Sequence, residues 1–215
     1  MLSLLIVARL LEYPDEALWQ ARDELESALT QCPELAEADR ARLADFIRHY
    51  YHAPLATRQS EYVAQFDHTR RCALYLCEHQ LAESKTRGQA MVNILQHYQQ
   101  AALTPAVREL PDYLPMVLEF AYLQDQTTPG EGLRILTQIV EVAQILYRRT
   151  KAGRYGVLFL LLLHLAGQQE DAQDETVTAP DIDAEWERAH APARVELPAL
   201  PPEHAATVHY LNLGR

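Results

Sequence analysis

The sequence has little glycine and no long runs in which β-branched residues alternate with polar ones. Only 7 of its 215 residues are glycine, although 48% are hydrophobic. Leucine and alanine, which favour helices, dominate that hydrophobic fraction, whereas strands depend on Val, Ile and Thr. A chain of this length also buries a substantial core. The composition therefore predicts an all-α, single-domain, multi-helix bundle.

Positive charge is also scarce, since 19 Lys and Arg face 30 Asp and Glu for a formal net charge of -11. Binding to nucleic acid requires a basic face, so we expect no nucleic-acid partner. Residues 168–190 hold eight acidic side chains against Arg188 alone, a net charge of -7. We interpret this stretch as a solvated tail, with attraction of a basic partner as the alternative. We expect a helical domain over residues 1–166 and an acidic, then proline-rich, partly disordered tail over residues 167–215.

Long hydrophobic runs and paired cysteines are missing as well. The most apolar run, Tyr155–Ala166, is shorter than the roughly 20 residues that span a bilayer, so it predicts a buried core helix and no stable membrane insertion. No basic region precedes the short apolar run at the N-terminus, which argues against a signal peptide. The three cysteines Cys32, Cys72 and Cys77 form no CxxC pair, which is typical of a reducing compartment. We therefore expect a cytoplasmic protein.

Motifs that mark common enzymes are absent from the sequence. It contains no GxGxxG, GxxxxGK[ST], HExxH or GxSxG pattern and no zinc-type cluster of Cys and His, so we expect no enzymatic activity and no cofactor. His79 and Glu83 would share one helix face, close to Glu78, and could form half a metal site or a proton relay. A His and a Glu at that spacing more often form a pair on the protein surface. The alternative, a small helical enzyme or metalloprotein, is left open.

Helical periodicity recurs along most of the chain. The predicted helices are Leu2–Leu11, a helix capped by Asp15 with its apolar stripe from Leu18 to Leu29, Glu37–Tyr51, Arg58–Phe66, Arg71–Glu83, Gly88–Ala102, Gly132–Arg149 and Tyr155–Ala166. Gly88 is predicted to mark a positive φ angle or a close approach of another group.

Two prolines interrupt the helical pattern in RELPDYLPMVLEF, Arg108–Phe120. Both fit if a helix begins at or after Asp112, because Pro115 then lies in the first turn, where a missing N–H costs little. Asp112 would cap that helix. Glu109, Asp112 and Glu119 would gather acids at the junction and form a receptor for a cationic peptide.

Five blocks give the chain a family resemblance: LLEYPD, SEYVAQFD, EHQLAESKTRGQAMVNIL, RELPDYLPMVLEF and the near-terminal YLNL. In this order and spacing they resemble the molybdenum cofactor assembly chaperones of nitrate reductase, also called nitrate reductase delta subunits, within the wider group of redox enzyme maturation proteins. The resemblance implies an all-helical chaperone without catalytic activity. It would bind the N-terminal segment of the catalytic alpha subunit apoenzyme, support molybdenum cofactor insertion and delay membrane attachment. Molybdenum cofactor biosynthesis proteins would be a further class of partner. A chaperone for a different molybdoenzyme and a plain structural adaptor are the alternatives.

The resemblance also suggests which residues bind the partner peptide. The EYxxLF-like element of the wider group falls on Glu61, Tyr62 and Phe66, and its proline-aspartate-histidine hinge falls on Pro111 and Asp112, with Tyr113 in place of histidine. Tyr62, Phe66, Tyr113 and Leu114 would supply apolar anchors, and the three acids of the junction would meet basic side chains. The full predicted peptide-binding set is Tyr62, Phe66, Asp67, Arg70, Glu78, His79, Arg87, Gln89, Glu109, Pro111, Asp112, Tyr113, Leu114 and Glu119.

Overall fold

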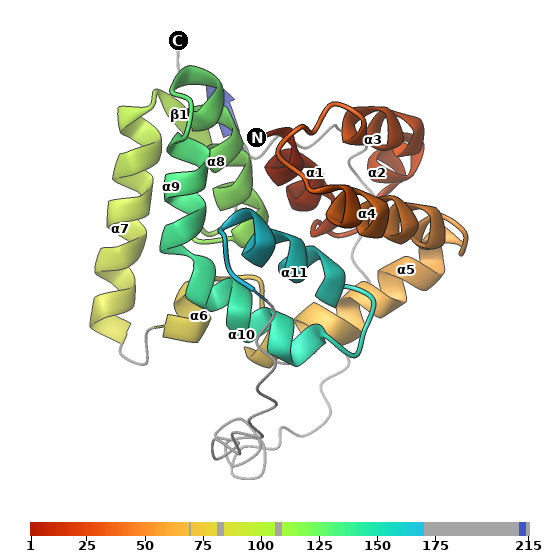
Figure 1. Ribbon diagram of the computed structural model, residues 1–215. Helices are drawn as coiled ribbons and strands as arrows, with labels where there is room; N and C mark the ends of the chain where they lie inside the picture. The colour runs from red at the N-terminus through yellow and green to blue at the C-terminus, as the bar shows by residue number, and fades with distance from the viewer. Residues whose placement is uncertain (69, 81–83, 106–108, 170–210, 214–215) are drawn as a thin grey trace, which may run out of the picture.

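A computed structural model of the chain describes residues 1–68, 70–80, 84–105, 109–169 and 211–213. This described part contains eleven α-helices, a π-helical turn η1, a 3-10 turn η2 and two short strands (Figure 1). Their bounds are α1 Leu2–Leu10, α2 Glu16–Gln20, α3 Arg22–Leu29, α4 Glu37–Tyr50, α5 Leu55–Tyr62, η1 Val63–Asp67, η2 Arg70–Cys72, α6 Cys77–Gln80, α7 Ser84–Gln100, β1 Leu103–Pro105, α8 Leu114–Thr127, α9 Glu131–Gln138, α10 Val140–Thr150, α11 Gly156–Leu165 and β2 Leu211–Leu213. The predicted all-α class is confirmed.

The core is built around α1, α8 and α11. Helix α8 is buried without interruption from Leu114 to Ala121, and α11 buries seven of its ten residues. Helix α1 lies against both, and α10 packs along α11. Buried residues of these helices join those of α3, α4 and α5 in one continuous apolar cluster, so the helices form a single domain. No helix in the described ranges combines the length and hydropathy that crossing a membrane requires.

Two of the predicted helices are divided in the structure. The stripe from Leu18 to Leu29 is split at Ala21 into α2 and α3, although Asp15 caps α2 as predicted and accepts a hydrogen bond from the N–H of Leu18 at 2.7 Å. The predicted helix Gly132–Arg149 is split at Ile139 into α9 and α10. Most apolar side chains stay buried on both sides of each break, such as Leu18 and Leu25 at the first and Leu136 and Val142 at the second, whereas Leu133 is 40% exposed.

The continuous helix predicted over Arg71–Glu83 is wrong. In its place stand η2, a non-helical stretch through Leu74, Tyr75 and Leu76, and the short α6, while Glu83 lies outside the described residues. The backbone of this stretch pairs instead with residues 109–114, which we call the hinge segment. The N–H of Leu76 donates to the carbonyl of Asp112, and the N–H of Leu114 donates to the carbonyl of Leu74. Tertiary hydrogen bonding has replaced the local helical pattern.

Gly88 also differs from the prediction. It lies within α7, its φ angle is not positive, and an added Cβ would meet no atom within 4 Å. The structure therefore gives no steric reason for glycine at this position.

A small antiparallel sheet joins the end of the sequence to the helical body. Leu103, Thr104 and Pro105 of β1 pair with Leu213, Asn212 and Leu211 of β2, and β2 also contacts α8. This part of the predicted tail packs against the domain. Residues 170–210 and 214–215 lie outside the described residues.

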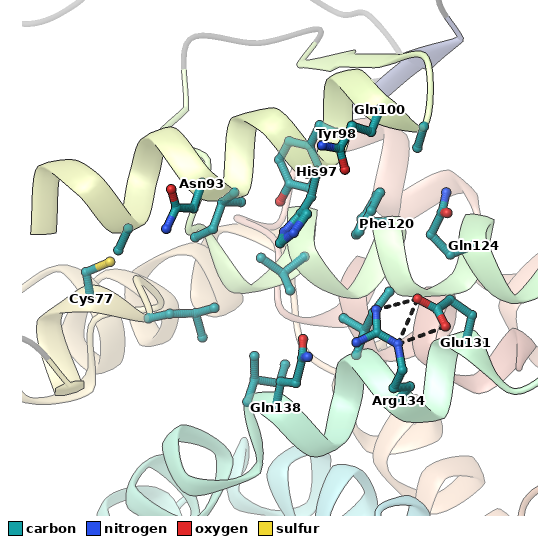
Figure 2. A pocket seen from close by; sticks show the side chains of 17 residues that line it. Cys77, Asn93, His97, Tyr98, Gln100, Phe120, Gln124, Glu131, Arg134 and Gln138 are labelled. Carbon is teal, nitrogen blue, oxygen red and sulfur yellow. Dashed lines mark hydrogen bonds and ion pairs between the residues drawn. The ribbon is translucent and has the colours of Figure 1, made fainter.

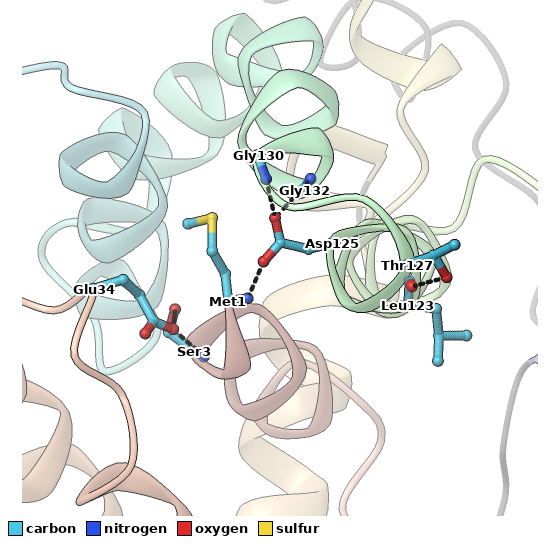
Figure 3. Close-up of polar contacts among 8 residues, drawn as sticks. All are labelled: Met1, Ser3, Glu34, Leu123, Asp125, Thr127, Gly130 and Gly132. Carbon is cyan, nitrogen blue, oxygen red and sulfur yellow. Dashed lines mark hydrogen bonds and ion pairs between the residues drawn. The ribbon is translucent and has the colours of Figure 1, made fainter.

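Asp125 ties the end of α8 to the start of α9 (Figure 3). Its Oδ1 accepts hydrogen bonds from the N–H groups of Gly130 and Gly132, and its Oδ2 pairs with the amino group of Met1. The ion pair and the backbone N–H donors hold the pKa of this carboxyl below its usual range, against the opposing effect of burial. The carboxylate thus connects α1 with the α8–α9 turn.

Candidate functional site

A pocket lined by aromatic side chains lies where η1, the stretch after η2 and the hinge segment meet. We call it the aromatic pocket; it has a volume of about 230 Å³ and is lined by Tyr13, Tyr62, Phe66, Asp67, Leu74, Tyr75, Glu109 and Tyr113. Five of these eight residues belong to the predicted peptide-binding set. They come from two stretches about 50 residues apart in the sequence, which the fold brings together.

The base of the pocket is a group of packed rings. Tyr62 at the end of α5 and Phe66 in η1 share one face at a spacing of four residues, with ring centroids 4.9 Å apart. Phe66 also packs edge to face on Tyr155, at 4.8 Å. Side chains four positions apart on a helix naturally meet in this way. The η1 turn, in which the N–H of His68 donates to the carbonyl of Val63, continues the helix far enough to place Phe66 beneath the pocket.

The hinge segment supplies Glu109 and Tyr113 to the lining of the pocket. Tyr75 and Tyr113 face each other in an isolated antiparallel bridge, with ring centroids 5.4 Å apart. The hydroxyls of Tyr62 and Tyr113 lie 3.1 Å apart, and the Tyr62 hydroxyl donates to the carbonyl of Leu11. Burial raises the pKa of Tyr62 far above its usual value, so this hydroxyl stays protonated. The pocket offers apolar surface and neutral hydroxyls.

Two carboxylates and one exposed ring border the pocket. Glu109 accepts a hydrogen bond from the Tyr75 hydroxyl at 2.9 Å, and Asp67 lies on the η1 side, where partial burial raises the pKa of its carboxyl. Tyr13, which is 46% exposed, packs edge to face on Tyr62 at 5.6 Å. An apolar wall beside acidic groups can hold a hydrophobic side chain whose neighbours are basic.

The structure corrects the predicted role of Asp112. Tyr113, not Asp112, is the N-cap residue of α8, and no side chain caps this helix. Asp112 is fully buried, and its Oδ2 accepts a hydrogen bond from the N–H of Cys77 at 3.0 Å. Burial, followed by the nearby Asp112 carboxylate, raises the pKa of the Cys77 thiol to about 12. Asp112 therefore fastens the hinge segment to the start of α6. The prediction that Pro115 lies in the first turn of α8 is confirmed.

Three other predicted residues are also buried. Pro111 accepts a hydrogen bond at its carbonyl from the Tyr98 hydroxyl, while Leu114 and Glu119 lie in α8 at 1% and 6% exposure. Of the three acids predicted to receive a cationic peptide, only Glu109 reaches the pocket in this structure. Pro111, Asp112, Leu114 and Glu119 shape the hinge from within.

The remaining predicted residues lie outside the aromatic pocket. Arg70 is exposed in η2, Glu78 and Arg87 form an ion pair at 2.5 Å, and Gln89 bonds the side chain of Asn93. His79 lies 2.7 Å from the carbonyl of Ala73, and burial lowers the pKa of its ring. Within the described ranges, no group of three His, Cys, Asp or Glu side chains is arranged to hold a metal ion.

Sequence reasoning missed three of the pocket residues, Tyr13, Leu74 and Tyr75. Leu74 and Tyr75 lie in the stretch that was predicted to be helical, and their contribution depends on the bridge to the hinge segment. Tyr13 lies in the block LLEYPD, and its place in that block was the available signal.

Comparison with known proteins gives a consistent family assignment. A sequence model described as nitrate reductase delta subunit matches residues 15–143. The chain is 38% identical over 198 residues, covering 87% of it and 83% of the relative, to the nitrate reductase molybdenum cofactor assembly chaperone NarJ of Escherichia coli K12. It is 36% identical over 191 residues, covering 85% of it and 79% of the relative, to the probable assembly chaperone NarW of the same strain. A probable NarJ of Bacillus subtilis is 32% identical over 117 residues, 52% of this chain and 60% of the relative.

Proposed function

The chain belongs to the nitrate reductase delta subunit family, and from this premise we propose that it is a molybdenum cofactor assembly chaperone for a nitrate reductase and not an enzyme. The family match over residues 15–143 and the names of the similar proteins support this function. A chaperone needs a binding surface for its client and no catalytic residues, which agrees with the motifs found and missing in the sequence.

The aromatic pocket is the proposed docking point for the N-terminal segment of the catalytic alpha subunit. The observation that carries this proposal is the meeting of Tyr62, Phe66 and Asp67 with Glu109 and Tyr113 around one hollow. These residues lie in the two stretches that the family resemblance singles out. The two stretches are about 50 residues apart in the sequence, and only the fold shows that their side chains line the same hollow.

The pocket chemistry suits a segment that carries both apolar and basic side chains. An apolar side chain would lie against the rings of Tyr62, Phe66 and Tyr113, and burial of such a group is worth about 1.5–3 kcal/mol. Basic neighbours would pair with Glu109 and Asp67 at the rim. The volume of about 230 Å³ accommodates side chains rather than a whole helix, so the rest of the segment would remain outside the pocket.

By holding the apoenzyme through this segment in the cytoplasm, the chaperone would support cofactor insertion and delay attachment to the membrane until maturation is complete. Cofactor insertion would take place while the segment is bound, and membrane attachment would follow its release.

A gene deletion combined with affinity purification tests the function. We expect the deletion strain to contain inactive nitrate reductase with little molybdenum cofactor, and the tagged chain to purify with the alpha subunit apoenzyme. Purification with a different molybdoenzyme would favour the alternative client. Normal nitrate reductase activity in the deletion strain would contradict the proposal and favour a plain adaptor.

A further inference from the structure

A second and larger hollow runs between α7 on one side and α8 and α9 on the other (Figure 2). We call it the α7 groove; its volume is about 560 Å³. Its apolar lining includes Ile94, Val117, Phe120, Ile135 and Ile139. It shares no lining residue with the aromatic pocket.

Helix α7 packs on the body through a buried side chain near its C-terminal end, and Arg87 near its other end pairs with Glu78 of α6. Tyr98 donates a hydrogen bond to the carbonyl of Pro111 at 2.8 Å and packs edge to face on Phe120 at 4.8 Å. It is the only buried side chain among residues 87–100, whereas Ile94 and Leu95 are half-buried. A helix is normally stabilised by burying its apolar face. The apolar residues of α7 beside the groove therefore leave room for a further packing partner.

The rim of the α7 groove carries little net charge. Glu131 and Arg134 neutralise each other in an ion pair, and the other polar rim groups include the carboxamides of Asn93, Gln100 and Gln124. Carboxamides can both donate to and accept from a polypeptide backbone. The rim thus suits a segment with little net charge and offers no counter-charge to a strongly acidic one.

The chain itself supplies a segment of that kind near the groove. Strand β2, Leu211–Leu213, pairs with β1, which follows α7 after a two-residue turn, and the groove is lined up to Gln100 and Ala101. Residues 170–210 connect α11 to β2. Residues 170–190 carry a net charge of -7, but residues 191–210 hold only Arg194, Glu196 and Glu203 apart from histidines, a net charge of -1.

We propose that the proline-rich stretch 194–202, RVELPALPP, occupies the α7 groove in the same molecule. Its residues Val195, Leu197 and Leu200 would lie on the apolar lining. The four prolines from Pro192 to Pro202 disfavour a helix, and proline-rich segments bind in extended form to grooves with apolar and aromatic walls at low entropic cost.

Distances allow this placement. The nine residues from Pro202 to Leu211 span at most about 30 Å when extended. The groove follows α7 from Ala90 to Ala101, about 16 Å along a helix axis. Because β2 anchors the chain beside the end of α7 only nine residues after Pro202, the effective concentration of the segment at the groove is high.

Paramagnetic broadening in the full-length chain tests the proposal. The three native cysteines are buried, so a nitroxide label can be attached selectively to an introduced cysteine in Ala199→Cys. We expect the label to remove most of the intensity of the methyl signals of Ile94, Ile135 and Ile139, and to leave that of Ile47 in α4, which does not line the groove. A label at Thr178→Cys, in the acidic stretch, is the matched control and should affect the three groove signals much less.

A second variant tests whether the broadening requires the two leucines of the segment while the protein stays folded. Adding Leu197→Asp and Leu200→Asp to the labelled chain should restore the three methyl signals, with an unchanged circular dichroism spectrum. Equal broadening of Ile47 and the groove residues, or no broadening, would overturn the proposal.

A mixture of nitroxide-labelled chains with isotopically labelled chains checks for binding between two copies. Broadening in the mixture would show that the segment of another molecule occupies the groove, and it would also overturn the proposal. These outcomes do not depend on nitrate reductase.

Discussion

The hydroxyl groups of Tyr62 and Tyr113 lie 3.1 Å apart, although 51 positions separate them in the sequence. Tyr62 ends α5 and Tyr113 occupies the N-cap position of α8, so this contact joins the first part of the chain to the hinge segment. Both rings line the aromatic pocket. The pocket therefore depends on how these two parts of the fold are held together.

Replacing Tyr62 by Phe tests the hydrogen bonds behind the pocket. The change removes the donor to the carbonyl of Leu11 and the contact with Tyr113, both of them buried. We expect the free energy of unfolding to fall by about 1–2 kcal/mol, measured by urea denaturation. Tyr13→Phe, at the exposed rim, is the control and should change it by less than about 0.5 kcal/mol. Equal stabilities of the two variants would show that the buried hydroxyl contributes nothing.

Asp112 is expected to act through the stability of the fold. Asp112→Ala removes the acceptor of the Cys77 N–H inside the protein, which should cost about 1–3 kcal/mol of unfolding free energy. Asp112→Asn keeps a side-chain oxygen for that N–H and should lose less. A chemical denaturation series of both variants measures this difference. If Asn and Ala were equally destabilising, the Cys77 hydrogen bond would not be the reason for the buried aspartate.

Much of the fold is predictable from local sequence, and the exceptions have a common cause. The apolar stripe of Glu37–Tyr51 and the run Tyr155–Ala166 predict α4 and α11 within one residue at each end. The Arg71–Glu83 prediction failed because Leu74 and Leu76 form backbone hydrogen bonds to residues about 38 positions away. Periodicity within one segment carries no information about such a distant partner.

In the candidate site, too, local motifs can be predicted from the sequence, whereas contacts between distant segments cannot. The two stretches that contain Tyr62 and Tyr113 can be identified from the sequence, because their motifs are local. Tyr75 enters the pocket only through the bridge to Tyr113. Asp112 looked like a helix cap because it precedes a proline-containing helix start, but its carboxylate turns to the N–H of Cys77. Side-chain direction at a turn depends on the nearest unsatisfied donor, which the sequence does not reveal.

Glu12 should make the stability of the protein depend on pH. Burial raises the pKa of its carboxyl to about 8, although the Arg9 guanidinium at 3.1 Å lowers it. Between the ordinary value of 4.5 and about 8 the unfolded chain is ionised while the folded one keeps the proton. Stability therefore falls as pH rises through this window.

The variant Glu12→Gln removes this ionisation. We expect it to raise the melting temperature at pH 8 relative to the parent chain, by an amount equivalent to about 1–3 kcal/mol, and to change it less at pH 5. Glu16→Gln, at an exposed position, is the control. A pH-independent effect of Glu12→Gln on melting would contradict the raised pKa.

Asp125 should stabilise the junction of α8 and α9. Asp125→Ala removes the acceptor for the N–H groups of Gly130 and Gly132 and the partner of the Met1 amino group. We expect a loss of about 1–3 kcal/mol in unfolding free energy and faster hydrogen exchange of the amides of residues 130–132. Thr127→Ala, whose hydroxyl bonds within α8, is a nearby control that should leave those amides protected.

The most direct test of the central claim is calorimetric titration of the full-length chain with the N-terminal peptide of the nitrate reductase alpha subunit. Tyr113→Ala and Glu109→Gln change the aromatic pocket, and Glu26→Gln changes an exposed ion pair in α3. We expect each pocket variant to bind the peptide at least about tenfold more weakly, equivalent to 1.4 kcal/mol, and Glu26→Gln to bind like the parent chain. Unchanged affinity in both pocket variants, with their helical content intact, would contradict the assignment of the aromatic pocket as the docking point.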